Sequence, residues 1–200
     1  MTNDQSTISK GLLEIPRTGR IGRFAKIIEK EIDTSSFIKI MDGSDKYNSL
    51  SSDKKALWWK NAIEKMEEQI GREKSISIMN KCGSKCCGAG QRKTAKRLMS
   101  ESTSITDFLN KIANYEVKEG ELEYKLIDDN TIIARHNRCF CGQVKNSKEV
   151  FENDIYCQCS VEFNKQFFQS AFNKPVEVKL VQSILNGAPY CEFNIKVNDK

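Results

Sequence analysis

A chain of 200 residues, of which 38% are hydrophobic and 30% charged, is long enough for one folded domain or one domain with a helical extension. It has no apolar run that approaches a membrane span. The formal net charge of +5 is small and spread along the chain, so nucleic acid is not the expected partner. The first residues lack the basic and apolar regions of a signal peptide, so we expect a cytoplasmic protein whose thiols stay reduced.

The first half of the chain has the periodicity of helices. Apolar residues recur at helical spacing in five segments, which are residues 21–32, 52–70, 75–79, 91–99 and 105–112. The first segment has a basic face opposite its apolar one, so it either docks on the protein's own core or meets a membrane or an acidic partner. The second is the clearest helix, with an N-cap at Ser51–Asp53 and Gly71 at its end.

The second half changes to a period of two, which is typical of strands. Residues 122–126 and 131–141 predict one hairpin, and residues 176–181 and 191–197 predict another, with its turn at Asn186-Gly187. A phenylalanine-rich helix begins at Ser160 between them and ends near Pro175. The expected fold class is α+β, an N-terminal helical part followed by a mostly antiparallel sheet with a helix packed across it.

Three segments describe the expected organisation. Residues 1–50 form an N-terminal arm with short helices, residues 51–118 form a helical part, and residues 119–200 form a sheet-and-helix part. We expect the last two segments to make one compact unit.

Seven of the eight cysteines fall into three clusters, at Cys82, Cys86, Cys87, Cys139, Cys141, Cys157 and Cys159. On strands, Cys139 and Cys141 would share one face, as would Cys157 and Cys159. If the two segments lie side by side, four thiols converge, which predicts a zinc site with an iron–sulfur cluster as the alternative. The upstream cluster would join this site or form a second one. Gly83, Gly88 and Gly142 would let the backbone approach the metal.

A cysteine nucleophile is the alternative to a metal. Cys86 or Cys157 would then attack a small thioester-, amide- or thiazoline-like substrate, which makes the protein a hydrolase. The base would be His136, the only histidine, which strand alternation turns away from Cys139 and Cys141 and which is more often structural. Inert thiols in an interaction protein are the third interpretation. Cys191 alternates with core residues and is expected to be a small core side chain.

The C-terminal quarter resembles a known kind of domain. Tyr156-Cys-Gln-Cys-Ser-Val, a helix, Lys174-Pro-Val-Glu-Val-Lys and the hairpin segment Tyr190-Cys-Glu-Phe-Asn-Ile together look like the end of a 4-vinyl reductase-type domain. They are also similar to L-2-amino-thiazoline-4-carboxylic acid hydrolase-like proteins and to cysteine-rich, uncharacterised bacterial and archaeal proteins. The chain departs from the pattern at Gly187-Ala188, where a Gly-Asp pair is usual, and at residues 161–164, where glycines are usual.

The resemblance implies an α/β ligand-binding fold related to haem-NO-binding domains and transport-particle subunits. Members of such groups bind small molecules or act as sensory modules, some of them with metal. The leading prediction is therefore a small-molecule-binding or sensor module with a thiolate metal site. The sequence leaves open whether the chain forms a homodimer.

Overall fold

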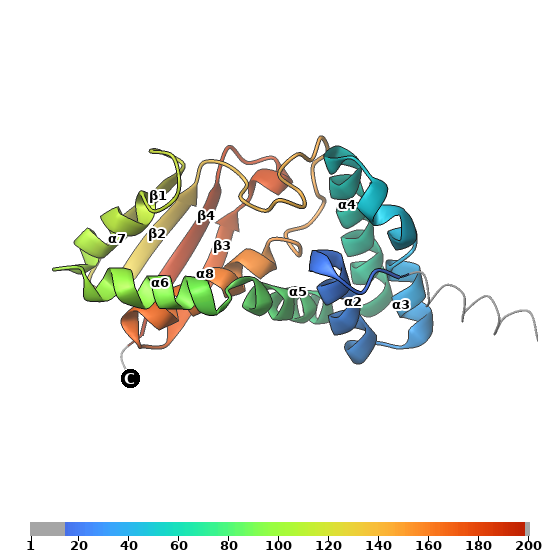
Figure 1. The fold of residues 1–200 in the computed structure, drawn as a ribbon, viewed down its shortest axis with the longest axis horizontal. Coiled ribbons are helices and arrows are strands. Elements are labelled where there is room, and N and C mark those ends of the chain that lie inside the picture. The colour runs from blue at the N-terminus through green and yellow to red at the C-terminus, as the bar shows by residue number, and fades with distance from the viewer. Residues whose placement is uncertain (1–14, 199–200) are drawn as a thin grey trace, which may run out of the picture.

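The computed structural model describes residues 15–198 (Figure 1). Its first half contains helices, and its second half contains four strands, with one long helix between the second strand and the third. The helices are α2 (Gly19–Glu31), α3 (Thr34–Ile40), α4 (Ser52–Ile70), α5 (Arg72–Cys86), α6 (Ala89–Ser100), α7 (Ile105–Ala113) and α8 (Gln158–Phe172), with short 3-10 turns η1 (Ser44–Ser49) and η2 (Ile184–Asn186). The strands are β1 (Leu122–Leu126), β2 (Thr131–His136), β3 (Val176–Gln182) and β4 (Cys191–Val197). The predicted α+β class is confirmed.

Several helix ends follow from local chemistry and match the prediction. α4 ends at Gly71, which has a positive φ of 77° that glycine adopts without strain. α7 begins at Ser104, whose side chain accepts a hydrogen bond from the amide of Asp107. α8 ends at Asn173, in a left-handed conformation that Pro175 follows. None of the helices described within residues 15–198 is long and apolar enough to cross a membrane.

The four strands form one antiparallel sheet in the order β1-β2-β4-β3. Along β4, Cys191, Phe193 and Ile195 alternate as buried residues with more exposed neighbours, as predicted for Cys191. α8 packs across the buried face, where Phe168 has 0% relative exposure. In Figure 1, α6 and α8 extend from the sheet toward the helical part made by α2, α3 and α4.

Two apolar clusters hold the two parts together. The first contains α2 to α5 and includes Phe24, Trp58 and Trp59, so the apolar face of α2 docks on the protein's own core. The second contains α6, α7, the sheet and Phe168. Residues 144–157 return to the first cluster, which joins the sheet to the helical part.

The structure corrects the local geometry predicted for the cysteines. β2 ends at His136 instead of residue 141, so Cys139 and Cys141 lie in an irregular loop and strand alternation does not apply to them. Cys157 is the N-cap of α8 and Cys159 lies in its first turn, so this segment is helical instead of extended. α5 is also longer than the predicted residues 75–79. It places Cys82 and Cys86 one helical turn apart, as expected, with Cys87 after its end.

Candidate functional site

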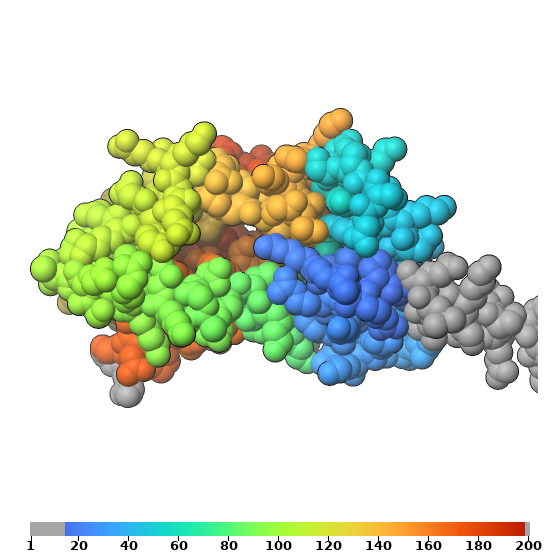
Figure 2. All heavy atoms as spheres, viewed as in Figure 1, coloured from blue at the N-terminus to red at the C-terminus, as the bar shows by residue number. Residues whose placement is uncertain are grey.

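A cavity of about 370 Å³ lies between the buried face of the sheet, the helices α6, α7 and α8, and the start of α2. Figure 2 shows its opening as a hollow between α2, α6 and the loop after β2, with the colours of α8 and β4 at its floor. This volume is at the lower end of the range for small-molecule pockets. The cavity draws on elements from the beginning, middle and end of the described chain.

Most of the cavity wall is apolar. The sheet supplies Leu122, Tyr124, Cys191 and Phe193, which point inward because alternate strand residues share one face. The helices supply the rest of this wall, with Leu98, Ile112, Phe163 and Phe167. Phe163 and Phe167 lie one turn apart on α8 with nearly parallel rings, at an interplanar angle of 12°. Such a wall favours a flat, apolar ligand body.

His136 places one buried polar atom on this wall. Its Nε2 is buried and has no hydrogen-bond partner among the described residues. The ring lies between Phe140 and Phe193, with centroid distances of 5.5 and 5.1 Å. Burial lowers the pKa of His136 to about 4, so the imidazole is neutral at pH 7. An unpaired buried polar atom costs about 1–3 kcal/mol, which a ligand group could recover.

Three polar side chains belong to the lining of the cavity, Arg20 and Arg138, which are exposed, and Tyr156, which is buried. Arg20, at the start of α2, donates from Nη1 to Cys141 Sγ at 3.2 Å. The Tyr156 hydroxyl lies 3.1 Å from the same sulfur. Arg138 stacks on the Phe140 ring at 4.0 Å from its centroid and pairs with Glu121 at 2.7 Å. The opening is therefore polar and cationic, whereas the interior is apolar.

The structure places five of the seven clustered cysteines around this cavity, namely Cys86, Cys139, Cys141, Cys157 and Cys159. Cys82 lies beside Cys86 and Cys159 in an adjoining cavity of about 30 Å³. Cys87 is buried after α5. Nevertheless, no three or more His, Cys, Asp or Glu residues within 15–198 are placed to hold a metal ion. The strand-based convergence of four thiols is therefore not the observed arrangement.

Burial makes several of these thiols poor nucleophiles. It raises the pKa of Cys157 and Cys82 to about 12, and that of Cys139 and Cys87 to about 11. Cys157 Sγ lies 3.0 Å from Ser183 Oγ, in a buried polar pair. The hydrogen bond with Ser183 lowers the pKa of Cys157, but burial outweighs it and keeps this thiol, one of the two predicted nucleophiles, neutral. Cys86, the other one, lines the cavity.

His136 is also not where alternation predicted it. Because β2 ends at this residue, His136 lines the same cavity as Cys139 and Cys141 instead of facing away from them. It makes no hydrogen bond to a thiol in the described part of the chain. A Cys–His pair of the kind required for nucleophilic catalysis is thus not formed in this conformation.

One of the three glycines predicted to approach a metal, Gly83, has a role in helix packing. A Cβ at Gly83 would lie 2.2 Å from the backbone oxygen of Cys159, so glycine is required for the close approach of α5 to α8. At Gly142, by contrast, a Cβ would meet nothing within 4 Å. Helix packing therefore explains Gly83 without any bound metal.

Sequence reasoning missed Arg20 and Gln91 as lining residues of the cavity. Both lie in the first turn of a helix, Arg20 far from the cysteine clusters in sequence and Gln91 four residues after Cys87, and no local pattern indicates that these helix starts meet at one cavity. Tyr156 was noted only as part of a motif, although its hydroxyl reaches Cys141. Only the tertiary structure shows that these residues line the cavity.

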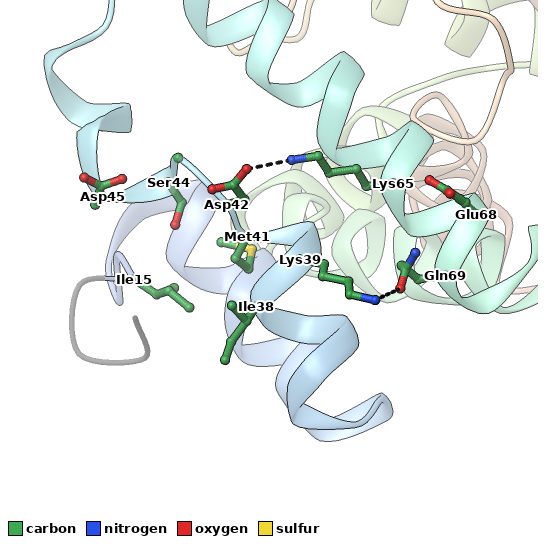
Figure 3. Close-up of a pocket in the computed structure, with 11 residues that line it drawn as sticks. Ile15, Ile38, Lys39, Met41, Asp42, Ser44, Asp45, Lys65, Glu68 and Gln69 are labelled. Carbon is green, nitrogen blue, oxygen red and sulfur yellow. Dashed lines mark hydrogen bonds and ion pairs between the residues drawn. The ribbon is translucent and has the colours of Figure 1, made fainter. Parts of the chain in front are cut away.

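A second hollow lies between α3 and α4 (Figure 3). It has a volume of about 510 Å³ and opens to solvent. Four of its polar side chains form two pairs, Lys65 with Asp42 at 3.0 Å and Lys39 with Gln69 at 3.2 Å. None of the buried side-chain atoms found without a partner in residues 15–198 belongs to its lining. This hollow therefore provides no unpaired buried polar atom for a ligand among the described residues, whereas the cavity beside His136 does.

Fold and site together define an α+β domain with an internal, largely apolar cavity. A family model matches residues 23–200, so the chain belongs to the family described as a family of unknown function (DUF6144). No curated protein matches the chain.

Solved structures of low identity have a similar outline. The phenol-responsive sensory domain of the transcription activator PoxR with phenol is 13% identical, with a TM-score of 0.48 over 74% of this chain and 75% of that chain. A trafficking protein particle complex subunit 3 from Naegleria fowleri, covalently bound to palmitic acid, is 13% identical, with a TM-score of 0.47 over 74% and 95%. An H-NOX protein from S. oneidensis in the Fe(II)NO ligation state is 11% identical, with a TM-score of 0.44 over 89% and 99%. These likenesses carry no information about the ligand of this chain.

Proposed function

We propose that the protein is a small-molecule-binding or sensor module whose ligand occupies the cavity between the sheet and α6, α7 and α8. The observation that carries the proposal is the cavity of about 370 Å³, whose lining includes His136, a residue whose Nε2 is buried and has no partner in the described structure. A ligand hydroxyl can either donate to or accept from an imidazole nitrogen, so it would satisfy this atom in either tautomer. The stacked Phe163 and Phe167 would contact the flat body of the same ligand.

Filling the cavity tests this proposal. Leu122 lines the cavity from β1, so Leu122→Trp would place an indole where the ligand binds. Lys125→Trp is the matched control, because Lys125 is exposed on the opposite face of the same strand. Binding of phenol, benzamide and benzoate would be followed by saturation-transfer NMR. We expect transfer to at least one compound in the wild type and in Lys125→Trp, and its loss in Leu122→Trp.

Equal transfer in both tryptophan variants would place the compounds elsewhere. No transfer to any compound in the wild type would contradict binding of small aromatic molecules. Circular dichroism of both variants would show that each retains its fold.

The resemblance to 4-vinyl reductase-type domains remains part of the proposal. It is supported by the position of its most specific motif, because Cys191 and Phe193 of the C-terminal hairpin both line the cavity. The motif would then contribute directly to ligand binding.

A thiolate metal site is a second candidate. It is supported by Cys82, Cys86 and Cys159, which line one small cavity, although their side chains would have to rotate toward a common centre to hold an ion. Zinc is the preferred metal and an iron–sulfur cluster the alternative. Metal analysis of protein purified without added metal should give about one zinc per chain. A metal-free protein with an intact fold would contradict this candidate.

The hydrolase alternative now depends on Cys86, which lines the cavity and therefore lies within reach of a bound substrate. Loss of turnover in Cys86→Ser, with ligand binding retained, would support it. Turnover of a thioester substrate that is unchanged in this variant would contradict it.

A further inference from the structure

We infer that the ligand of this cavity is an organic anion, a carboxylate attached to a compact, flat, apolar body. This inference rests on the proposed binding function and adds the charge of the ligand to it. It depends on three observations: the charges that line the cavity, the surroundings of Arg20, and the helix ends that open onto the cavity.

The lining of the cavity contains cations and no carboxylate among the described residues. Arg20 and Arg138 are its charged side chains, and His136 is neutral because of its burial. Glu121 pairs with Arg138, which leaves Arg20 without a carboxylate partner among residues 15–198. Arg20 is exposed, so solvent screens part of its charge, while the apolar walls beside it lower the dielectric on the cavity side.

Arg20 differs from Arg17, which precedes α2, and resembles Arg23 of the same helix, which donates to the backbone oxygen of Lys85 and has no ion pair within residues 15–198. Arg17 has an ion pair with Glu29 at 2.6 Å. Within residues 15–198, Arg20 forms no ion pair and donates instead to the sulfur of Cys141. The groups that raise its pKa against the cost of burial are the side chains of Cys86, Cys141, Cys159 and Tyr156, and none is a carboxylate. A ligand carboxylate could accept from the same guanidinium through charge-assisted hydrogen bonds.

The helix ends at the cavity are also positive. α2 and α6 contribute first-turn residues, Arg20 and Gln91, to its lining, and neither helix has an acidic residue in its first turn or a side-chain cap. Each of α4, α5 and α7 has an acid in its first turn, and α3 has Asp33 as its N-cap. The amino end of a helix carries a partial positive charge that favours anions. A bound anion would therefore meet two helix dipoles as well as Arg20.

The two ends of the cavity orient such a ligand. Its carboxylate would lie at the opening beside Arg20, and its flat body would lie against Phe163 and Phe167. A hydroxyl on the body could pair with the buried Nε2 of His136. Compact aromatic acids with a ring hydroxyl combine all three features, so we use benzoate and 4-hydroxybenzoate as probes.

The test compares acids with neutral molecules of the same shape. Calorimetry of the full chain would measure benzoate against benzamide and 4-hydroxybenzoate against 4-hydroxybenzamide. We expect the wild type to bind each acid more tightly than its amide. Arg20→Gln should weaken binding of the acids on the order of tenfold or more, because a hydrogen bond to a charged group contributes about 1.5–3 kcal/mol, and it should weaken binding of the amides by a smaller factor, because their head group carries no charge.

Two controls make the result specific. Lys26→Gln removes the same charge from an exposed position on α2 and should change neither series. Arg20→Lys keeps the charge and should retain part of the acid preference. Amides that bind as tightly as acids would overturn the anion inference but leave the proposed binding function intact. Equal losses in Arg20→Gln and Lys26→Gln would also overturn it. Failure of both acids and amides to bind would overturn both proposals.

Discussion

His136 shows how one partly buried side chain can connect a ligand site to stability. Its imidazole is neutral in the folded protein, because burial lowers its pKa from 6.5 to about 4. Between these two values the unfolded chain takes up a proton that the folded chain does not. The contribution of His136 to the free energy of unfolding is therefore complete above pH 6.5 and is lost as the pH falls toward 4.

We therefore expect acid to destabilise the protein partly through His136. Over this pH range the free energy of unfolding should fall by up to about 3 kcal/mol from this residue. In His136→Phe, which keeps an aromatic ring beside Phe140 and Phe193, that part of the loss should disappear. Urea unfolding of both proteins between pH 7.5 and 4.5 would measure the difference. Parallel curves for the two proteins would show that His136 is not shielded from water.

At the scale of elements, the contact between α5 and α8 brings two cysteine clusters together. The backbone of Cys159 lies against Gly83, where any Cβ would overlap it. The contact is possible only because position 83 has no side chain. It fixes Cys82 and Cys86 beside Cys159 at the edge of the cavity.

Gly83→Ala should destabilise the protein by about 1–3 kcal/mol, because an added methyl group in a packed contact forces the backbones apart. Gly90→Ala in α6 is the matched control. A Cβ at Gly90 would meet nothing within 4 Å, and alanine in a helix is favoured over glycine by about 0.5–1 kcal/mol. Denaturant unfolding of both variants would measure these changes. If alanine had the same effect at both positions, the close contact between α5 and α8 would not exist.

These elements also show what the sequence could predict. Local signals were sufficient for α4, for the Ser104 cap of α7 and for the alternation in β4, because each depends on neighbours along the chain. The end of β2 was missed because Arg138 and Cys139 continue a plausible alternating pattern past the last pairing, His136 with Cys191. That error produced the predicted four-thiol face.

The candidate site was predictable only in part. The cysteine clusters correctly indicated where distant segments meet, and one edge of the α8 aromatic face does line the cavity. The chemistry of the cysteines did not follow from their spacing in the sequence, because the burial of their thiols and the position of Arg20 depend on tertiary packing. An arginine at residue 20 has no sequence feature that links it to Cys141.

At the scale of the whole molecule, the cavity lies where the two apolar clusters approach each other. Its opening is built by α2 from the first cluster, and its floor by α8 and the sheet from the second. A ligand that contacts Arg20 and Phe193 together would connect both clusters. Binding should therefore stabilise the arrangement of the two parts as well as the residues that it touches.

Hydrogen exchange can detect this connection. With the tightest-binding aromatic acid at saturation, we expect slower amide exchange at the start of α2, in β1 and in the loop of residues 137–144, because local opening of these segments would require the ligand to leave. Residues 38–45 and 65–69, which line the open hollow of Figure 3, serve as the internal control and should exchange as in the free protein. Protection confined to that control region would place the ligand between α3 and α4. Protection of β1 without α2 would mean that the ligand contacts the sheet but does not join the two clusters.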